Sequence, residues 1–158
     1  MGNDHAGYPL RSAVREAVVA LGHELVDFGS ATPEACDYPD VVVPLTQAIL
    51  RGECELGILF CGTGIGMCIA ANKVPGIRAA LAPDELSARL SRSHNDANVL
   101  CLSADLIGQT LVKRIVDLWL TTPFDGGRHQ RRLGKIQLIE RGVNPAEGAA
   151  GIDLAPGS

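Results

Sequence analysis

Apolar residues along the chain alternate between short continuous runs and positions spaced three or four residues apart. The short runs predict strands over His23–Phe28, Leu56–Phe60, Ile77–Leu81 and Val99–Leu102. The spaced positions predict helices over Pro9–Leu21, Ile65–Asn72, Asp84–Ser93 and Arg128–Arg141, and one around Leu111–Trp119. A further helix is predicted after the polar loop Ser30–Pro39 and ends near Arg51. Because strands and helices alternate with short links, the pattern predicts an α/β fold with a parallel sheet covered by helices on both faces.

Length and composition are those of one globular domain. We expect that domain to cover residues 1–141 of 158, followed by a loose tail over residues 142–158 that is rich in Gly, Ala and Pro. A formal net charge of −4 argues against nucleic acid as a partner. No apolar run has the length of a membrane span, and the first residues lack a signal-peptide pattern. We therefore expect a cytoplasmic protein with no membrane partner.

The number of cysteines is five, and this odd number argues against a disulfide framework. No C-x-x-C pair occurs, which argues against a structural zinc site. Cys54, Cys68 and Cys101 are interpreted as small hydrophobic residues in or near the core. Cys36 lies in a polar loop and its role stays open. Only Cys61 has a sequence setting that suggests chemistry.

Cys61 follows the predicted strand Leu56–Phe60 and precedes a turn rich in glycine, Gly62-Thr63-Gly64-Ile65-Gly66. Such a turn points backbone N–H groups outward and provides a site for an anion. The same positive potential favours a thiolate at its edge. One loop thus offers a base or nucleophile together with donors for developing negative charge, which suggests an enzyme. The alternatives are a cysteine that only packs, or a nucleotide-binding turn with G-x-G-x-G in place of the usual glycine spacing.

Other polar residues flank the predicted strands and helices. Asp4 and His5 precede the first helix, at an edge of the sheet where ligands collect, although Asp4 also suits a helix cap. The segment from Ser93 to Asp96 precedes a strand, so it serves this pocket or one across a dimer interface. Arg128 and Arg132 are four residues apart on one helix face, suited to a phosphate or simply to solvent.

Several of these motifs occur together and in the order of a known family. The motifs are Asn3-Asp4-His5-Ala6-Gly7, Asp37-Tyr38-Pro39, Cys61 to Gly66, Ala71-Asn72-Lys73, Gly76-Ile77-Arg78-Ala79, His94 to Asn98, and Gly127-Arg128-His129-Gln130-Arg131-Arg132. From residue 2 to about 141 the chain resembles ribose-5-phosphate isomerase B, a family that also includes allose- and galactose-6-phosphate isomerases. The resemblance implies a Rossmann-like three-layer α/β/α sandwich. It also implies a homodimer or homotetramer that isomerises a small sugar phosphate without metal or other cofactor.

The resemblance also implies roles for individual residues. Cys61 matches the base that moves a proton between C2 and C1 of the sugar, and His94 matches the residue that opens the sugar ring. Thr63 shares the loop and is expected to help move or hold a proton. The expected substrate-binding residues are Asp4, His5, Tyr38, Gly62, Gly64, Ile65, Gly66, Asn95, Arg128 and Arg132. His129 is a further contact or an exposed side chain.

Two departures from the family pattern leave alternatives open. The chain begins almost at Asp4, where relatives carry an apolar strand, so we expect a truncated first strand, with the native start upstream or a shortened, less stable form. Asp105 stands where the family usually has an arginine, and its charge would repel a phosphate. The alternatives to a ribose 5-phosphate isomerase are a six-carbon sugar phosphate isomerase, a nucleotide-binding domain and an inactive binding domain.

Overall fold

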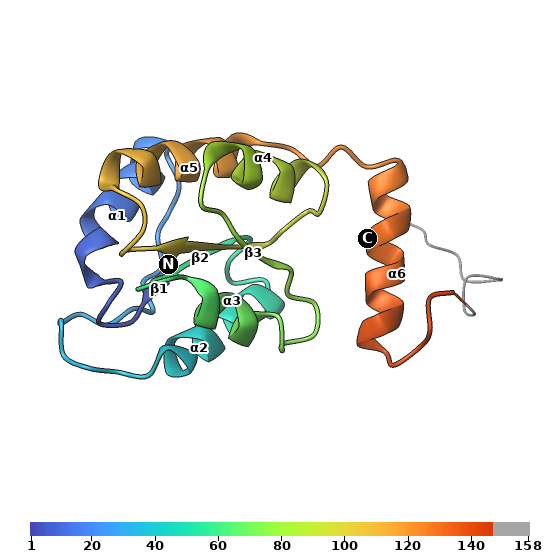
Figure 1. The fold of residues 1–158 in the computed structure, drawn as a ribbon, viewed down its shortest axis with the longest axis horizontal. Coiled ribbons are helices and arrows are strands. Elements are labelled where there is room, and N and C mark those ends of the chain that lie inside the picture. The colour runs from blue at the N-terminus through green and yellow to red at the C-terminus, as the bar shows by residue number, and fades with distance from the viewer. Residues whose placement is uncertain (147–158) are drawn as a thin grey trace.

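In the computed structural model the described residues are 1–146. They form short parallel strands and, apart from one short 3₁₀ turn, α-helices, coloured in chain order in Figure 1. The strands are β1 (Gly2–Asn3), β2 (Gly57–Cys61), β3 (Ala79–Leu81) and β4 (Val99–Ser103). The helices are η1 (Tyr8–Leu10), α1 (Arg11–Ala20), α2 (Tyr38–Leu50), α3 (Ile65–Ala71), α4 (Glu85–Ser93), α5 (Gln109–Thr121) and α6 (Arg128–Glu140).

The strands form one parallel sheet in the order β1-β2-β4-β3. Helices α1, α4 and α5 cover one face, while α2 and α3 cover the other (Figure 1). β2 and β4 are buried along their whole length, because both faces are covered and their residues are almost all apolar. This is the predicted three-layer α/β/α arrangement, and the parallel strands place all their carboxyl ends at one edge of the sheet.

The prediction of a strand over His23–Phe28 is wrong, although this segment lies beside the sheet. The amide of Phe28 donates to the carbonyl of Met1 at 2.9 Å, and that of Ser30 donates to Asn3 at 2.8 Å. β1 itself has only two residues, paired through Gly2 with Leu59 and through Asn3 with Phe60. With so few partners, the 23–28 segment does not build a ladder long enough to count as a strand.

The remaining predicted elements are confirmed, with ends that differ by a few residues. The start of α4 has the expected cap: the carboxylate of Asp84 accepts from the amide of Ser87 at 2.7 Å, and the Ser87 hydroxyl lies 3.4 Å from the Asp84 amide. Most of the tail predicted over residues 142–158 lies outside the described residues. No helix among the described residues is long and apolar enough to cross a membrane.

Helix α6 stands apart from the helices that cover the sheet (Figure 1). It lies across the segment that leads into β3, where the amide of Gly76 donates to Glu140 Oε1 at 3.1 Å. Its buried side includes Leu133 and Leu138, whereas Ile136 and Ile139 are exposed on another side. α6 therefore offers apolar surface that residues 1–146 leave exposed.

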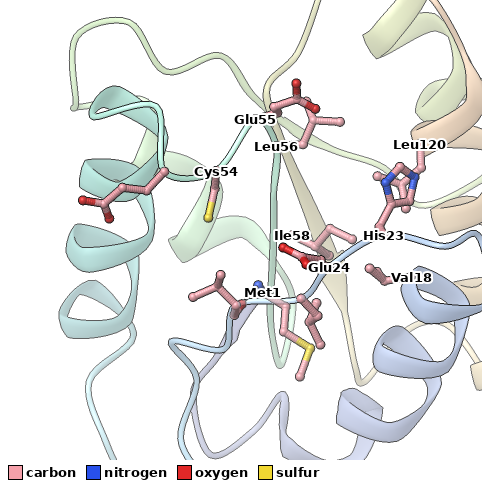
Figure 2. A pocket seen from close by; sticks show the side chains of 12 residues that line it. Met1, Val18, His23, Glu24, Cys54, Glu55, Leu56, Ile58 and Leu120 are labelled. Carbon is pink, nitrogen blue, oxygen red and sulfur yellow. Dashed lines mark hydrogen bonds between the residues drawn. The ribbon is translucent and has the colours of Figure 1, made fainter.

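A cavity of about 310 Å³ opens near the amino end of β2 and beside Met1 (Figure 2). Its lining comes from α1, the segment after it, the residues before β2 and the end of α5; it includes His23, Glu24, Cys54, Glu55 and Leu120. None of the predicted site residues lines this cavity. The candidate chemistry lies elsewhere on the molecule.

Candidate active site

Cys61 is the last residue of β2, and its side chain is buried. The amide of Gly64 donates to Cys61 Sγ at 3.1 Å, so the turn holds the sulfur in a fixed place. Gly64 has φ of +76°, and a Cβ there would meet the Leu102 carbonyl oxygen at 2.8 Å. Both facts require glycine at this position. The glycine-rich turn therefore holds the Gly64 N–H close to the sulfur.

The Asp4–Gly7 turn packs against the same end of β2. Asp4 is buried, and its Oδ1 accepts from the Gly7 amide at 2.9 Å, so it closes the turn before η1 and does not cap the first helix as the sequence had also allowed. Gly7 lies so close to the Phe60 carbonyl that a side chain would not fit. His5 is exposed, with Nδ1 3.2 Å from the Cys36 carbonyl oxygen. Asp4 and His5 thus lie next to the Cys61 turn.

Three further side chains complete this group. The Tyr38 ring lies over Gly66, where a Cβ would come within 2.8 Å of Tyr38 Cζ. Asp105 Oδ2 lies 2.8 Å from the place a Gly62 Cβ would occupy, so a carboxylate stands over the turn where the family usually has an arginine. Thr63 is exposed, and its Oγ1 accepts from the Ile65 amide at 3.3 Å. We call Asp4, His5, Tyr38, Cys61, Thr63 and Asp105 the carboxyl-edge group.

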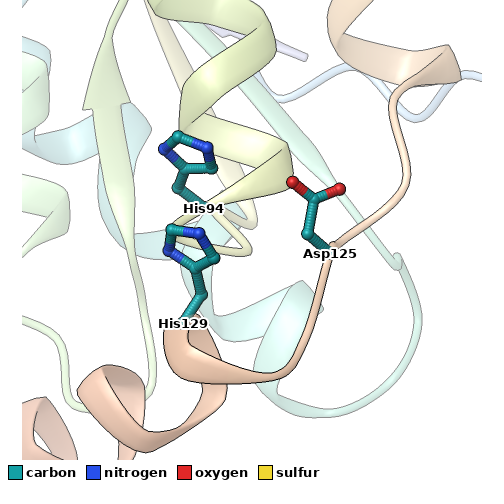
Figure 3. Close-up of side chains that lie close together, drawn as sticks. All are labelled: His94, Asp125 and His129. Atoms are coloured by element: carbon teal, nitrogen blue, oxygen red, sulfur yellow. The ribbon is translucent and has the colours of Figure 1, made fainter.

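A second group lies at the C-terminal end of α4 and the start of α6. The rings of His94 and His129 stack with centroids 4.1 Å apart and planes 9° apart (Figure 3). Arg128 Nε lies 3.3 Å from His129 Nε2, while Arg128 and Arg132 are both exposed. Asn95 is also exposed, and its carbonyl accepts from Arg78, just before β3. We call His94, Asn95, Arg128, His129 and Arg132 the amino-edge group.

The two groups lie at opposite edges of the sheet. Cys61 is paired with Ser103 at the carboxyl end of β4, whereas His94 and Asn95 precede Val99 at its amino end. β4 spans five residues, a length of about 13 Å at the usual rise of a strand. One chain therefore does not bring Cys61 and His94 together, and a site across an interface stays a prediction for the His94 segment.

The sequence left His129 between a contact and an exposed side chain, and it gave no role to Asp125. His129 is buried under His94, and burial lowers the pKa of its imidazole, as do the nearby His94, Arg128 and Arg132; Asp125 acts in the opposite direction. Asp125 lies beside both rings. The sequence did contain one signal for a sharp turn between α5 and α6, the Gly126-Gly127 pair, which has positive φ at both residues.

The interpretation of Cys68 and Cys101 as small hydrophobic residues in or near the core is confirmed, since Cys101 is fully buried and Cys68 packs against the core from its edge. Cys68 is half-buried, and a hydrogen bond from the Cys101 thiol lowers its pKa to about 7, against the effect of burial. Asn72 Nδ2 also lies 3.6 Å from Cys68 Sγ. Cys68 is therefore a second thiol with the environment of a reactive one.

We expect alkylation of Cys68 by iodoacetamide to rise through pH 7, because the thiolate is the reactive form and its pKa lies near 7. Mass mapping of the labelled peptides across about pH 5.5 to 9, a range that includes both the expected midpoint and that of an ordinary thiol, would measure it. The Cys101→Ala variant removes the main donor, so its midpoint should move to higher pH. A wild-type midpoint near the ordinary thiol value, about 8.5, would contradict the assignment.

Comparison with known proteins places these features in one family. Residues 1–136 match the family described as Ribose/Galactose Isomerase. The chain is 44% identical over 143 residues to ribose-5-phosphate isomerase B of Escherichia coli, covering 90% of this chain and 96% of that protein. It is 42% identical over 141 residues to a D-erythrulose-4-phosphate isomerase of Pectobacterium atrosepticum, covering 89% and 93%. The solved ribose-5-phosphate isomerase B of Clostridium thermocellum is 48% identical, with a TM-score of 0.87 over 89% of this chain and 95% of that one.

Proposed function

This chain belongs to the ribose/galactose isomerase family, and from that premise we propose that it interconverts ribose 5-phosphate and ribulose 5-phosphate. Members of this kind are aldose–ketose isomerases, so the reaction moves hydrogen within one sugar phosphate and needs no net oxidant. The observation that supports it most is the turn at Cys61, where a buried sulfur and an aligned backbone N–H meet at the carboxyl edge of the sheet. That is the position where ligands collect in open parallel sheets.

The reaction begins with a sugar that is mostly a closed ring. His94 gives a proton to the ring oxygen and accepts the proton of the O1 hydroxyl, which yields the open-chain aldehyde. Imidazole suits both transfers, because it gains and loses a proton near neutral pH. The half-buried position of His94 at the end of α4 leaves its ring accessible to such a substrate.

Cys61 as thiolate then takes the proton from C2, and the electron pair moves to form an enediolate with negative charge on O1. The thiol returns this proton to C1, while the O2 proton passes to O1, leaving a carbonyl at C2. Thr63 is placed in the same turn to carry the second proton. Since the Gly64 and Ile65 N–H groups already bond within the turn, the remaining backbone N–H groups of the turn are the proposed donors to the developing charge, at about 3–4 kcal/mol for each well-placed donor.

The phosphate is bound by Arg128 and Arg132, which lie one helical turn apart at the exposed start of α6. The two guanidinium groups give this end of α6 a positive potential, which also disfavours a proton on the His129 ring between them. Asp4, His5, Tyr38 and Asn95 bind the sugar hydroxyls. Asp105 places an acidic group over Gly62, which is compatible with a hydroxyl there but not with the phosphate. The phosphate therefore lies toward the amino-edge group.

A complete site then needs two copies of the chain. Cys61 and Thr63 come from one copy, and His94, Asn95, Arg128 and Arg132 come from the other, because one chain holds the two groups at opposite sheet edges. The exposed Ile65 and Ile69 on α3 and Ile136 and Ile139 on α6 provide apolar surface for such contact. The protein is accordingly a homodimer, or a homotetramer built from such dimers, that acts in the cytoplasm.

An assay that compares sugar phosphates tests the substrate. Ribose 5-phosphate, allose 6-phosphate, galactose 6-phosphate and erythrulose 4-phosphate are offered at equal concentration, the last because one relative is named for it. We expect kcat/KM for ribose 5-phosphate to exceed the others by about tenfold or more, the discrimination that a pocket achieves against one extra or missing carbon. A higher kcat/KM for any other sugar would contradict the assigned substrate while leaving the isomerase chemistry intact.

A further inference from the structure

Asp125 lies beside the stacked pair of His94 and His129, in the loop between α5 and α6 (Figure 3). One atom from each of the three side chains, an imidazole nitrogen or a carboxylate oxygen, lies within 4.8 Å of the others. Backbone hydrogen bonds fix this arrangement: the Asp125 amide donates to the Ser93 carbonyl at 2.9 Å, and the His129 amide donates to Gly126 at 3.0 Å. The loop therefore ties the carboxylate to the residue immediately before His94.

The charges around the pair explain what a carboxylate does there. His129 is buried, and His94 from α4 together with Arg128 and Arg132 from α6 all disfavour a proton on its ring. Asp125 is the group whose charge favours that proton. Two imidazoles stacked at 4.1 Å would repel each other if both were charged. A proton taken up by the pair thus needs a nearby negative charge.

The same three side chains have a spacing that a transition metal would accept after a small contraction. However, Arg128 and Arg132 face the same cluster, and Arg128 Nε lies 3.3 Å from His129 Nε2. A bound cation would meet this positive charge, whereas a substrate phosphate would be attracted by it. The geometry and the charges together therefore indicate that the Asp125 carboxylate interacts with the two imidazoles and is not a metal ligand.

We propose that Asp125 is a positioning residue that holds the His94–His129 stack in place and stabilises the proton the pair carries while the sugar ring opens. This rests on the proposed function, since it requires His94 to exchange protons with the closed sugar. Asp125 acts through the two imidazoles and does not touch the substrate. Its effect should therefore be confined to the ring-opening step.

Open-chain and closed substrates separate that step from the rest. Ribulose 5-phosphate cannot form a five-membered ring, because its C5 oxygen carries the phosphate. Exchange of its C1 hydrogen with solvent deuterium therefore reports the Cys61 step without ring opening. Conversion of ribose 5-phosphate requires both. A variant of a residue that serves only ring opening therefore has a lower rate of ribose 5-phosphate conversion and an unchanged rate of deuterium exchange into ribulose 5-phosphate.

The test compares Asp125→Asn and Asp125→Glu with wild type, and Asp117→Asn, at an exposed position of α5, as a control with the same change in charge. We expect Asp125→Asn to lower kcat/KM for ribose 5-phosphate by about tenfold, a fraction of what a full acid–base residue supplies. Deuterium exchange into ribulose 5-phosphate should stay within twofold or so of wild type. Asp125→Glu should restore most of the activity, since it keeps the carboxylate.

An NMR titration of the histidine ring protons gives a readout independent of turnover. In Asp125→Asn the pKa of His129 should fall, because the charge that opposes its lowering is gone. An unchanged His129 pKa, or equal loss of conversion and exchange, would overturn the proposal. So would a chelator that reproduces the defect in wild type, since the cluster would then hold a metal. A wild-type protein inactive on ribose 5-phosphate would instead refute the proposed function itself.

Discussion

Replacing Cys61 with alanine is expected to lower the turnover number for ribose 5-phosphate by about 10³-fold, within the range that general acid–base residues contribute. The sulfur is the group placed to take the C2 proton, and Gly64 N–H fixes its position at 3.1 Å. Exchange of the C1 hydrogen of ribulose 5-phosphate with solvent deuterium should be lost to the same degree, since it uses the same base. Binding of ribulose 5-phosphate, followed by calorimetry, should change little, because the proposed phosphate contacts lie on α6.

The control for this variant is Cys68→Ala, which makes the same substitution at a half-buried cysteine seven residues later in the chain. It should retain turnover near the wild-type value, because Cys68 lies outside the carboxyl-edge group. Cys61→Ser adds a variant of nearly native size, so that loss of packing is separated from loss of the base. Turnover within tenfold or so of wild type in Cys61→Ala would remove the sulfur from the mechanism.

Replacing His94 with asparagine is expected to lower kcat/KM for ribose 5-phosphate by about 10²-fold, the smaller end of the acid–base range. Asparagine still donates and accepts hydrogen bonds, but it does not exchange a proton near neutral pH. Deuterium exchange into ribulose 5-phosphate should persist, because this sugar is already open. This pattern differs from that of Cys61→Ala, which loses both rates.

His23→Asn is the matched control, since His23 is exposed and lies near the cavity beside Met1, away from both groups. It should behave as wild type in both measurements. If His94→Asn loses deuterium exchange as completely as it loses conversion, His94 acts in the proton transfer at carbon and not in ring opening.

Much of the fold followed from the sequence because its main signals are local. Alternating apolar runs gave the parallel sheet, and Asp84 with Ser87 gave the start of α4. The predicted strand over His23–Phe28 failed because a strand needs a partner. Among the described residues its neighbour at the sheet edge is Met1, just before the two-residue β1, and the number of pairs that form depends on the whole sheet rather than on the segment itself.

The candidate site was predicted as a set of residues and less well as an arrangement. The turn at Cys61 is where the sequence placed it, because Gly64 requires a positive φ that a glycine signals. The segment from His94 was left between two places, although one signal was available. Residues before a parallel strand lie at the opposite edge from residues after one, so His94 and Cys61 could have been separated from the topology alone.

The stacked histidines and Asp125 were beyond reach from the sequence, because they depend on how α6 returns against α4. His129 is buried only through that return, and Asp125 reaches the pair through its hydrogen bond to Ser93. Likewise, the effect of the Cys101 thiol on the pKa of Cys68 depends on how helix α3 packs against strand β4. Contacts of this kind are set by packing and not by a local pattern.

A mixed dimer tests the composite site most directly. Cys61→Ala and His94→Asn chains carrying different affinity tags are produced together, and the dimer that holds one of each is purified. If each site takes Cys61 from one copy and His94 from the other, one of the two sites is intact, and turnover per dimer should be about half that of wild type. A mixed dimer as inactive as its two parents would mean that both residues act within one chain, and the account would be wrong.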